Sequence, residues 1–224
     1  MNLPKLEIDG LSIVLIGSFN PSIFQPQWLV AQGLISQTEA SEYEKDIQII
    51  SPQVSSFKLS MGAISVTPQV FQVITKKSPY FEKVRDLVIG IFRILQHTPI
   101  IQMGINWDRH YKFSNEEQWH ELGFKLAPKE PWKNILKNPG LFDLKIQGKR
   151  TDNNIGQIIV TVAPSRGFSI QYGVYLQIND HYDIQHLYKE NPSVGCTPIL
   201  DLLQKNWFES QSLRDKIIKE IIGG

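Results

Sequence analysis

The strongest folding signal in the chain is a helix-to-strand passage that runs from Ser78 to Phe113. Ser78-Pro79 opens a segment in which apolar residues recur at helical spacing and charged residues fall between them. The apolar positions form one wide stripe: Phe81, Val84, Leu87, Val88, Ile91, Phe92 and Leu95. Such a stripe predicts an amphipathic helix over Pro79–Gln96 that packs on the protein core. The apolar run that follows, Pro99–Trp107, predicts a core strand.

Strand-like segments are grouped along the chain and do not alternate with helices. A second long helix is predicted from Pro198 to Ile222, with an interruption near Ser210–Ser212. Grouped strands predict an α+β fold in which antiparallel sheet packs on the two long amphipathic helices. Because each half of the chain brings several strands and one long helix, we also expect that the single unit 1–224 has two pseudo-equivalent halves, 1–113 and 114–224. The predicted strands are Leu11–Phe19, two or three within Ile47–Lys77, Leu141–Arg150, Ile155–Ala163 and Ser169–Asn179.

Shorter helices are predicted from their terminal residues. Pro26 suits the first turn of a helix, and Gly33 suits its C-terminal cap. Ser36 and Glu39 have the spacing of a capping box, as do Ser114 and Glu117. We expect the helix after Ser114 to end at Gly123, and another short helix over Pro128–Leu136.

Composition narrows the class of protein. A net charge of +1 over 224 residues argues against a dedicated nucleic-acid-binding protein. The single Cys196 excludes an internal disulfide and fits a reducing compartment. The apolar run Leu11–Gly17 follows acidic residues, unlike a signal peptide, and no segment approaches the roughly 20 apolar residues of a membrane span. The expectation is a cytoplasmic protein without a membrane segment.

The middle of the chain resembles a sporadically distributed family of bacterial proteins that has no agreed activity. The resemblance rests on FEKVRDLVIGIFRILQHTPIIQMGINWDRHYKF, on WHELGFKLAPKEPW, and on LKIQGKR with IIVTVAPS, within roughly residues 50–180. It implies a bacterial α+β protein that belongs to a multi-gene system, with defence against phage as one hypothesis. It implies no catalytic residue.

The polar end of the central strand is the first candidate site. If the strand continues past Trp107, alternation places Asn106, Asp108 and His110 on one face, and Trp107 with Arg109 on the other. A carboxylate two residues from an imidazole could orient it for acid–base catalysis. The structural alternative is an ion-paired strand end, in which Arg109 bridges to a neighbour.

Two further groups carry reactive residue types. Asp180, His181, Asp183 and His186 are residue types that bind metals, although their spacing matches no established metal motif and a solvated turn explains them equally well. Cys196 precedes Thr197-Pro198, so it stands where a helix N-terminus would favour a thiolate nucleophile. The alternative is a small buried side chain.

A local excess of lysine and arginine lies between Lys125 and Arg150. Aromatic residues are interleaved with these cations, as on surfaces that bind single-stranded nucleic acid or phosphate. The alternative is a solvated helix face and a charged edge strand. The candidate binding residues here are Lys129, Trp132, Lys133, Lys149 and Arg150.

The sequence contains no P-loop, dinucleotide-binding, nucleophile-elbow or zincin motif. The leading hypothesis is a non-catalytic binding or adaptor subunit of a bacterial multi-protein system, with a protein partner and no cofactor. The second is a nucleotide or small-molecule binding module with a pocket between sheet and helix. The third is a hydrolase that uses Asp108 and His110, or the Asp180–His186 cluster. Tryptophans are the expected interface anchors where exposed: Trp28, Trp107, Trp119, Trp132 and Trp207.

Overall fold

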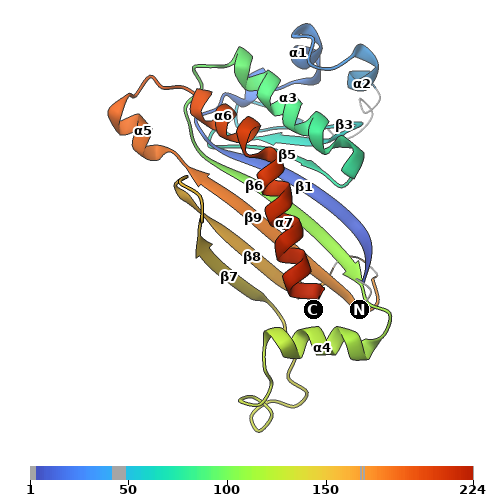
Figure 1. Cartoon of the computed structure of the whole chain (residues 1–224). Helices are drawn as coiled ribbons and strands as arrows, with labels where there is room; N and C mark the ends of the chain where they lie inside the picture. Colours follow the sequence, from blue (N-terminus) through green and yellow to red (C-terminus); the bar gives the residue numbers. More distant parts are fainter. Residues whose placement is uncertain (1–3, 42–48, 167, 169, 224) are drawn as a thin grey trace.

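The computed structural model describes residues 4–41, 49–166, 168 and 170–223, and Figure 1 shows how they are arranged. Within these residues, nine strands form one antiparallel sheet in the order β2-β3-β4-β5-β1-β6-β9-β8-β7. The predicted α+β class with antiparallel sheet is therefore confirmed. The strands are β1 (Lys5–Gly17), β2 (Ile49–Ile50), β3 (Ser55–Leu59), β4 (Gly62–Val66), β5 (Val70–Thr75), β6 (Ile100–Lys112), β7 (Leu144–Lys149), β8 (Gly156–Pro164) and β9 (Gly173–Asp183).

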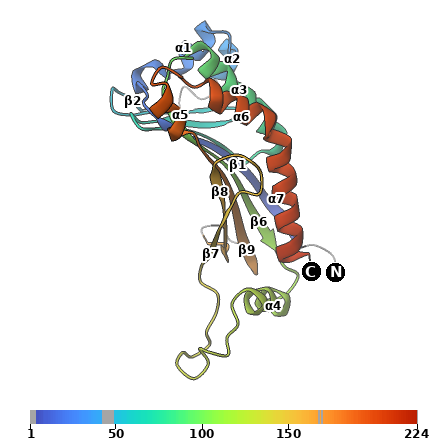
Figure 2. The ribbon, with the colours of Figure 1, turned by 60° about the vertical axis from the view of Figure 1, so that its left-hand side comes forward.

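The long helices lie on one side of the sheet, which we call its outer face (Figure 1). The sheet curves away from them and leaves the opposite, inner face without a covering layer of helices (Figure 2). The helices are α1 (Pro26–Ala31), α2 (Gln37–Ser41), α3 (Phe81–Ile94), α4 (Glu116–Leu126), α5 (Gln185–Glu190), α6 (Thr197–Lys205) and α7 (Trp207–Ile222), with 3-10 turns η1 (Pro21–Ile23) and η2 (Ser78–Tyr80).

Alternation along β1 and β6 separates the two faces. Leu11, Ile13 and Leu15 on β1 are fully buried and belong to the core under the helices. Trp107 of β6 pairs with Leu11 in the register and is also buried. The core therefore sits between the outer face and the helices, as the apolar stripe of α3 predicts.

The C-terminal helix α7 is fixed to the centre of the sheet through Trp107. The indole Nε1 of Trp107 donates to Ser210 Oγ of α7 at 3.0 Å. The rings of Trp107 and Trp207 lie 5.4 Å apart, and the Arg214 guanidinium lies 4.5 Å from the Trp107 ring centroid. Trp107 and Trp207, two of the expected interface anchors, are therefore core residues.

Several predicted boundaries were wrong. The C-terminal helix is divided at Asn206, between α6 and α7, and runs through Ser210–Ser212 without a break. Gly123 lies inside α4, which does not end there but continues to Leu126. The Pro128–Leu136 segment forms hydrogen-bonded turns and not a regular helix. The two-halves hypothesis is not confirmed, since β1 to β6 and β7 to β9 contribute unequally to one continuous sheet.

The terminal residues of the short helices behave largely as predicted. The Ser36 N–H donates to Glu39 Oε2 at 2.9 Å, and the Glu39 N–H donates to Ser36 Oγ at 3.2 Å, which completes the predicted capping box. Asn115, and not Ser114, caps α4 by accepting from the Gln118 N–H at 3.0 Å. No helix in the described ranges is both long enough and apolar enough to cross a membrane.

Candidate ligand site on the inner face of the sheet

The inner face of β6 and β9 carries a row of polar cross-strand pairs. Asn106 lies opposite Asn179, Asp108 opposite Gln177, and His110 opposite Tyr175. The prediction that Asn106, Asp108 and His110 share one face is confirmed, and so is the placement of Trp107 and Arg109 on the other. The sequence did not single out the three partners on β9, because a strand pattern does not reveal its register with a distant strand.

A cavity of about 590 Å³ opens on this face, over β1, β5, β6, β8 and β9. It lies on the opposite side of the sheet from the long helices, and not in the position between sheet and helix that the second hypothesis expects. The outer face is covered by the apolar side chains of the core. Its lining includes Ser12, Lys76, Asp108, His110, Phe142, Asp143, Thr161, Arg166, Phe168, Tyr175 and Gln177.

Asp108 is held at the floor of the cavity by two donors. Its Oδ1 accepts from the Tyr175 hydroxyl at 2.5 Å and from Gln177 Nε2 at 2.8 Å. Burial, with the carboxylate of Asp108 as a further cause, raises the pKa of Tyr175, so the phenol keeps its proton and donates. Oδ2 of Asp108 accepts no hydrogen bond from the described residues. One carboxylate oxygen is therefore positioned by the protein and the other remains available to a ligand.

His110 contacts Ser165 and lies between the rings of Tyr175 and Phe168. Its Nδ1 lies 2.7 Å from Ser165 Oγ, and its ring lies 4.9 Å from Tyr175 and 4.6 Å from Phe168. Burial lowers the pKa of His110, a shift that Lys76 increases and Asp108 opposes. The imidazole is therefore neutral near pH 7, and no hydrogen bond joins it to Asp108 within the described residues.

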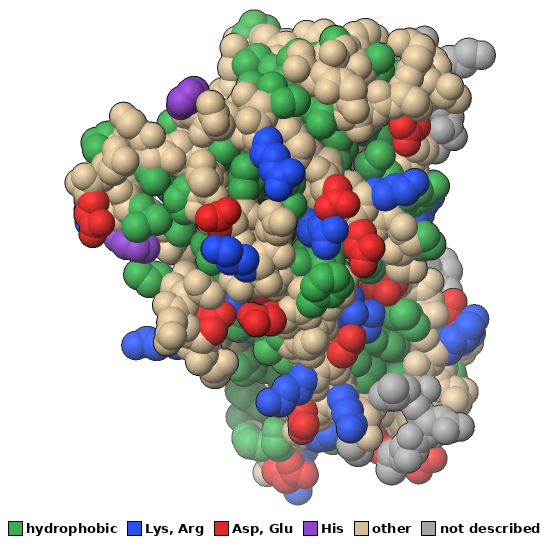
Figure 3. Space-filling view, turned by 45° about the horizontal axis from the view of Figure 1, so that its top comes forward, with side chains coloured by type: hydrophobic (Ala, Val, Ile, Leu, Met, Phe, Trp, Pro, Cys, Tyr) green, Lys and Arg blue, Asp and Glu red, His purple; other side chains and the backbone are tan. Residues whose placement is uncertain are grey.

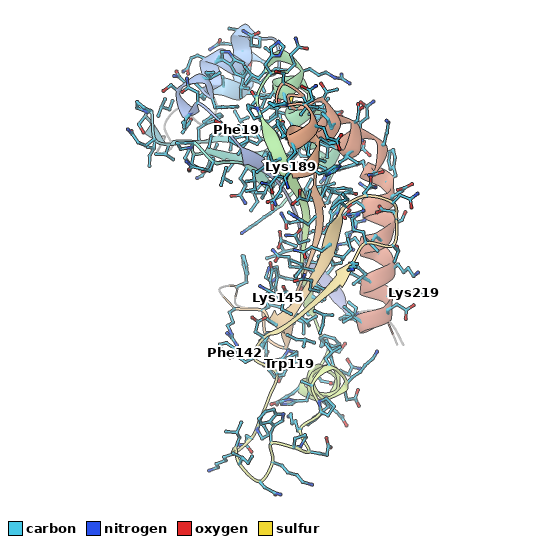
Figure 4. All side chains as sticks on the ribbon, turned by 90° about the vertical axis from the view of Figure 1, so that its left-hand side faces the viewer. Phe19, Trp119, Phe142, Lys145, Lys189 and Lys219 are labelled. Atoms are coloured by element: carbon cyan, nitrogen blue, oxygen red, sulfur yellow. The ribbon has the colours of Figure 1, made fainter. Side chains whose placement is uncertain are left out.

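Two cation–aromatic pairs stand at the mouth of the cavity. Lys76 Nζ lies 4.6 Å from the Phe168 ring centroid, and the Arg166 guanidinium lies 3.5 Å from the Phe142 ring centroid. Arg166 Nη2 also donates to the Phe142 carbonyl at 3.0 Å. Figure 4 shows Phe142 on the opposite side of the sheet from α7, where Lys219 is labelled. These residues lie on loops and strand ends, and of them only Phe142 lies within the basic stretch Lys125–Arg150 that the sequence offered as a candidate surface.

Several polar side chains on the floor have no hydrogen-bond partner among the described residues. Ser12 is 4% exposed and Thr161 9% exposed, and neither hydroxyl forms a hydrogen bond with any described residue. One register pair further along, Asn106 is 7% exposed and the buried Oδ1 of Asn179 has no partner in the part of the chain that is described. The hydroxyls of Ser12 and Thr161 line the cavity without a protein partner, so this floor has capacity for the polar atoms of a ligand.

The four metal-binding candidates do not converge. Asp180, His181 and Asp183 lie within β9, so the expected turn after the last strand was wrong. Alternation sends Asp180 to the outer face and His181 with Asp183 to the inner face, while His186 lies on α5. Among the described residues, no three histidine, cysteine, aspartate or glutamate side chains are placed to hold a metal ion.

Cys196 occupies the predicted position immediately before α6, but its environment differs from the prediction. Its side chain is fully buried, and Sγ donates to the carbonyl of Phe92 at 3.1 Å. Burial raises the pKa of the thiol to about 11. The structure therefore agrees with the alternative, a small buried side chain with a neutral thiol, and not with a thiolate nucleophile.

The basic stretch Lys125–Arg150 does not form one continuous surface. Arg150 is enclosed by Asp152 and Asp180, and Lys125 Nζ donates to the Glu220 and Ile221 carbonyls at the end of α7. Lys149 is exposed on β7, whereas Lys129 and Lys133 line a different hollow beside α4. Figure 3 shows cationic and anionic side chains interspersed on the face it presents.

Arg109 behaves as the structural alternative predicted. Its guanidinium pairs with Asp9, Nε to Oδ1 at 2.9 Å and Nη2 to Oδ2 at 3.2 Å, and reaches Asp215 of α7 at 3.3 Å. Of the five tryptophans, Trp132 is the exposed one at 51%, while Trp28 and Trp119 are half-buried.

The sequence matches no protein-family model and no curated protein.

Proposed function

We propose that the protein is a non-catalytic binding protein that holds a small ligand on the inner face of its sheet. The observation that carries the proposal is a pair of hydroxyls, those of Ser12 and Thr161, that line a cavity of about 590 Å³ and have no hydrogen-bond partner among the described residues. That volume lies within the range of roughly 300–1,000 Å³ that is typical of small-molecule sites. The cavity walls combine apolar rings with a few polar groups, the usual composition of such sites.

The arrangement of Asp108 and His110 supports binding over hydrolysis. Catalysis by this pair needs the carboxylate to orient the imidazole, but no hydrogen bond joins Asp108 to His110 among the described residues. His110 meets Ser165 through Nδ1, so a hydrolase would have to use this serine with no orienting acid among the described residues. Hydrolysis is retained only as the alternative function.

Removal of the Ser12 hydroxyl tests the proposal. Ser12→Ala should leave the free energy of unfolding nearly unchanged, because the hydroxyl has no partner in the free protein, but it should weaken ligand binding several-fold. The readout is thermal stabilisation by a library of metabolites, followed by calorimetric titration of each hit. Ser65→Ala is the matched control, since Ser65 lies on the inner face of β4 outside the cavity. Hits that bind both variants equally would refute the site.

A second candidate function is an adaptor in the bacterial cytoplasm, within a multi-protein system such as phage defence. The segment between α4 and β7 projects from the body of the protein (Figure 2) and exposes Trp132 at 51%, Ile135 at 75% and Leu136 at 51%. Lys133 and Lys137 flank these side chains, so the partner we expect is a protein with an apolar pocket and an acidic rim.

Co-purification with the product of a neighbouring gene tests the adaptor function. Ile135→Asp should abolish retention of that product and leave stability unchanged, because Ile135 is largely exposed. Phe208→Asp, at another exposed apolar residue on α7, is the control. Retention that survives Ile135→Asp would exclude this segment as the docking surface.

A further inference from the structure

We infer that the ligand of the inner-face cavity is a nucleotide whose base carries an amino group, with the base against Phe142 and Phe168 and the phosphate at Lys76 and Arg166. The inference rests on the proposed function and names the chemical class of the ligand. Three features of the cavity each restrict that class.

The first feature is the exposed aromatic surface at the mouth. Phe142 is 71% exposed and Phe168 37% exposed, although both line the same cavity. Exposed rings beside cations are the arrangement by which proteins stack bases, since every base presents a flat π-face. Because Arg166 and Lys76 already lie over these rings, a cationic ligand would meet repulsion there. A flat ring without positive charge fits this mouth.

The second feature is the placement of the two cations. Lys76 and Arg166 are both exposed, and they come from the end of β5 and from the loop after β8. Their positions leave donor groups free for an anion, and the planar fork of arginine matches phosphate oxygens. Asp108 and exposed Asp143 balance the two cations across the cavity, which disfavours a polyanion and favours a ligand with one anionic end.

The third feature is the acceptor on the floor. Asp108 Oδ2 has no donor within the described residues, and Gln177 has given its N–H to Oδ1, so its amide oxygen is a second acceptor. A carboxylate that faces a cavity is satisfied by N–H donors, as when aspartate accepts from the amino group of cytosine. Adenine, guanine and cytosine carry such a group, whereas uracil does not.

Calorimetric titration of the full chain with CMP and UMP isolates the amino group, and AMP and GMP extend the series. We expect at least one amino-bearing monophosphate to bind, about tenfold more tightly than UMP. Cytidine, which lacks the phosphate, and ribose 5-phosphate, which lacks the base, should each bind about tenfold more weakly than CMP. Asp108→Asn should abolish the preference over UMP.

Variants that neutralise the two cations at the mouth of the cavity test the nucleotide inference even if Asp108→Asn does not fold. Lys76→Gln and Arg166→Gln alter exposed side chains, and each should weaken nucleotide binding several-fold without changing the affinity for the nucleoside. Lys145→Gln is the matched control, because Lys145 is exposed on the inner face of β7 outside the cavity.

The outcomes separate the ligand class from the site. Ribose 5-phosphate or UMP binding as tightly as CMP would overturn the nucleotide inference, while any such binding that Ser12→Ala weakens would leave the proposed site intact. A non-aromatic ligand from the library, lost in Ser12→Ala, would do the same. Absence of binding by nucleotides and library alike would overturn both.

Discussion

Arg150 and Asp180 form an ion pair that is almost completely withdrawn from solvent, with side chains 7% and 1% exposed. Arg150 Nη1 donates to Asp180 Oδ1, and the guanidinium lies 3.8 Å from the Tyr182 ring centroid. Asp152 closes the other side through Oδ1 at 2.9 Å and Oδ2 at 2.7 Å. The pair joins the β7–β8 turn to the outer side of β9, so neither charge is available to a ligand at the surface.

Removing only one charge of the Arg150–Asp180 pair should destabilise the protein strongly. Asp180→Leu leaves the Arg150 charge without its most buried partner and should lower the free energy of unfolding by about 3–5 kcal/mol. The double variant Arg150→Met with Asp180→Leu should recover much of that loss, because neither charge remains. Urea unfolding measures both. Asp201→Asn, at an exposed pair with Lys205 at 3.9 Å, should change stability by less than about 0.5 kcal/mol. Equal effects at positions 180 and 201 would contradict this account.

The Trp107–Ser210 hydrogen bond should be measurable in the same assay. Ser210→Ala removes the acceptor for a buried indole N–H and should cost about 1–3 kcal/mol. Ser212 is exposed on the same helix. Ser212→Ala should leave the free energy of unfolding unchanged or raise it slightly, because alanine has the higher helix propensity. A neutral Ser210→Ala would show that the hydrogen bond does not fix α7 to β6.

Stability should depend on pH through two histidines. Burial is the first cause of a lowered pKa in both His110 and His181, below the ordinary 6.5. The unfolded chain therefore binds these protons more readily, so the free energy of unfolding should be constant above about pH 6.5 and fall as pH drops from there toward the folded pKa values. His110→Gln with His181→Gln should flatten that slope in urea titrations between pH 8 and pH 5. An unchanged slope would assign the dependence to other groups.

The carboxyl group of Asp152 should make stability depend on pH in a separate, more acidic range. The hydrogen bonds from Arg150 are the main cause that lowers the pKa of Asp152 from 3.8 to about 2. Its contribution is complete above pH 3.8 and is lost as pH falls from 3.8 toward 2. Asp152→Asn should therefore lower the free energy of unfolding at pH 5 and above, and the difference from wild type should shrink as the pH approaches 2. Acid unfolding curves of the two proteins measure the difference.

Cys196 should be unreactive while the protein is folded. The buried thiol, with a pKa of about 11, should resist a disulfide reagent at pH 8 and become reactive in denaturant. Labelling of the native protein at the rate of a free thiol would contradict the described burial.

Local signals predicted the parts of the fold that depend on neighbouring residues. The stripe of α3, the capping box at Ser36 and the alternation along β6 were all correct, because each is determined within a few residues of sequence. The end of α4 was wrong because Leu122 is buried in the core, and this packing outweighs the low helix propensity of Gly123.

The site could be predicted only in part for the same physical reason. Asp108 and His110 were recognised, but Ser12, Lys76 and Arg166 reach the same cavity from three distant parts of the chain. Their convergence depends on strand order and on the curvature of the sheet, neither of which has a sequence period. Alternation within β9 offered one signal, since it places Tyr175 and Gln177 on a shared face.

The strand order also has a consequence for biosynthesis. On the ribosome β1 is made before the other strands of this sheet, yet it lies at the centre of the strand order. Its Leu11 pairs with Trp107 of β6, a strand made much later. Until β6 is made, β3, β4 and β5 can form their local hairpins. The edge of β1 that later pairs with β6 has no partner strand during that time. Such non-local pairing slows folding and exposes nascent chains to aggregation. We expect the newly made chain to depend on chaperones until β6 has left the exit tunnel.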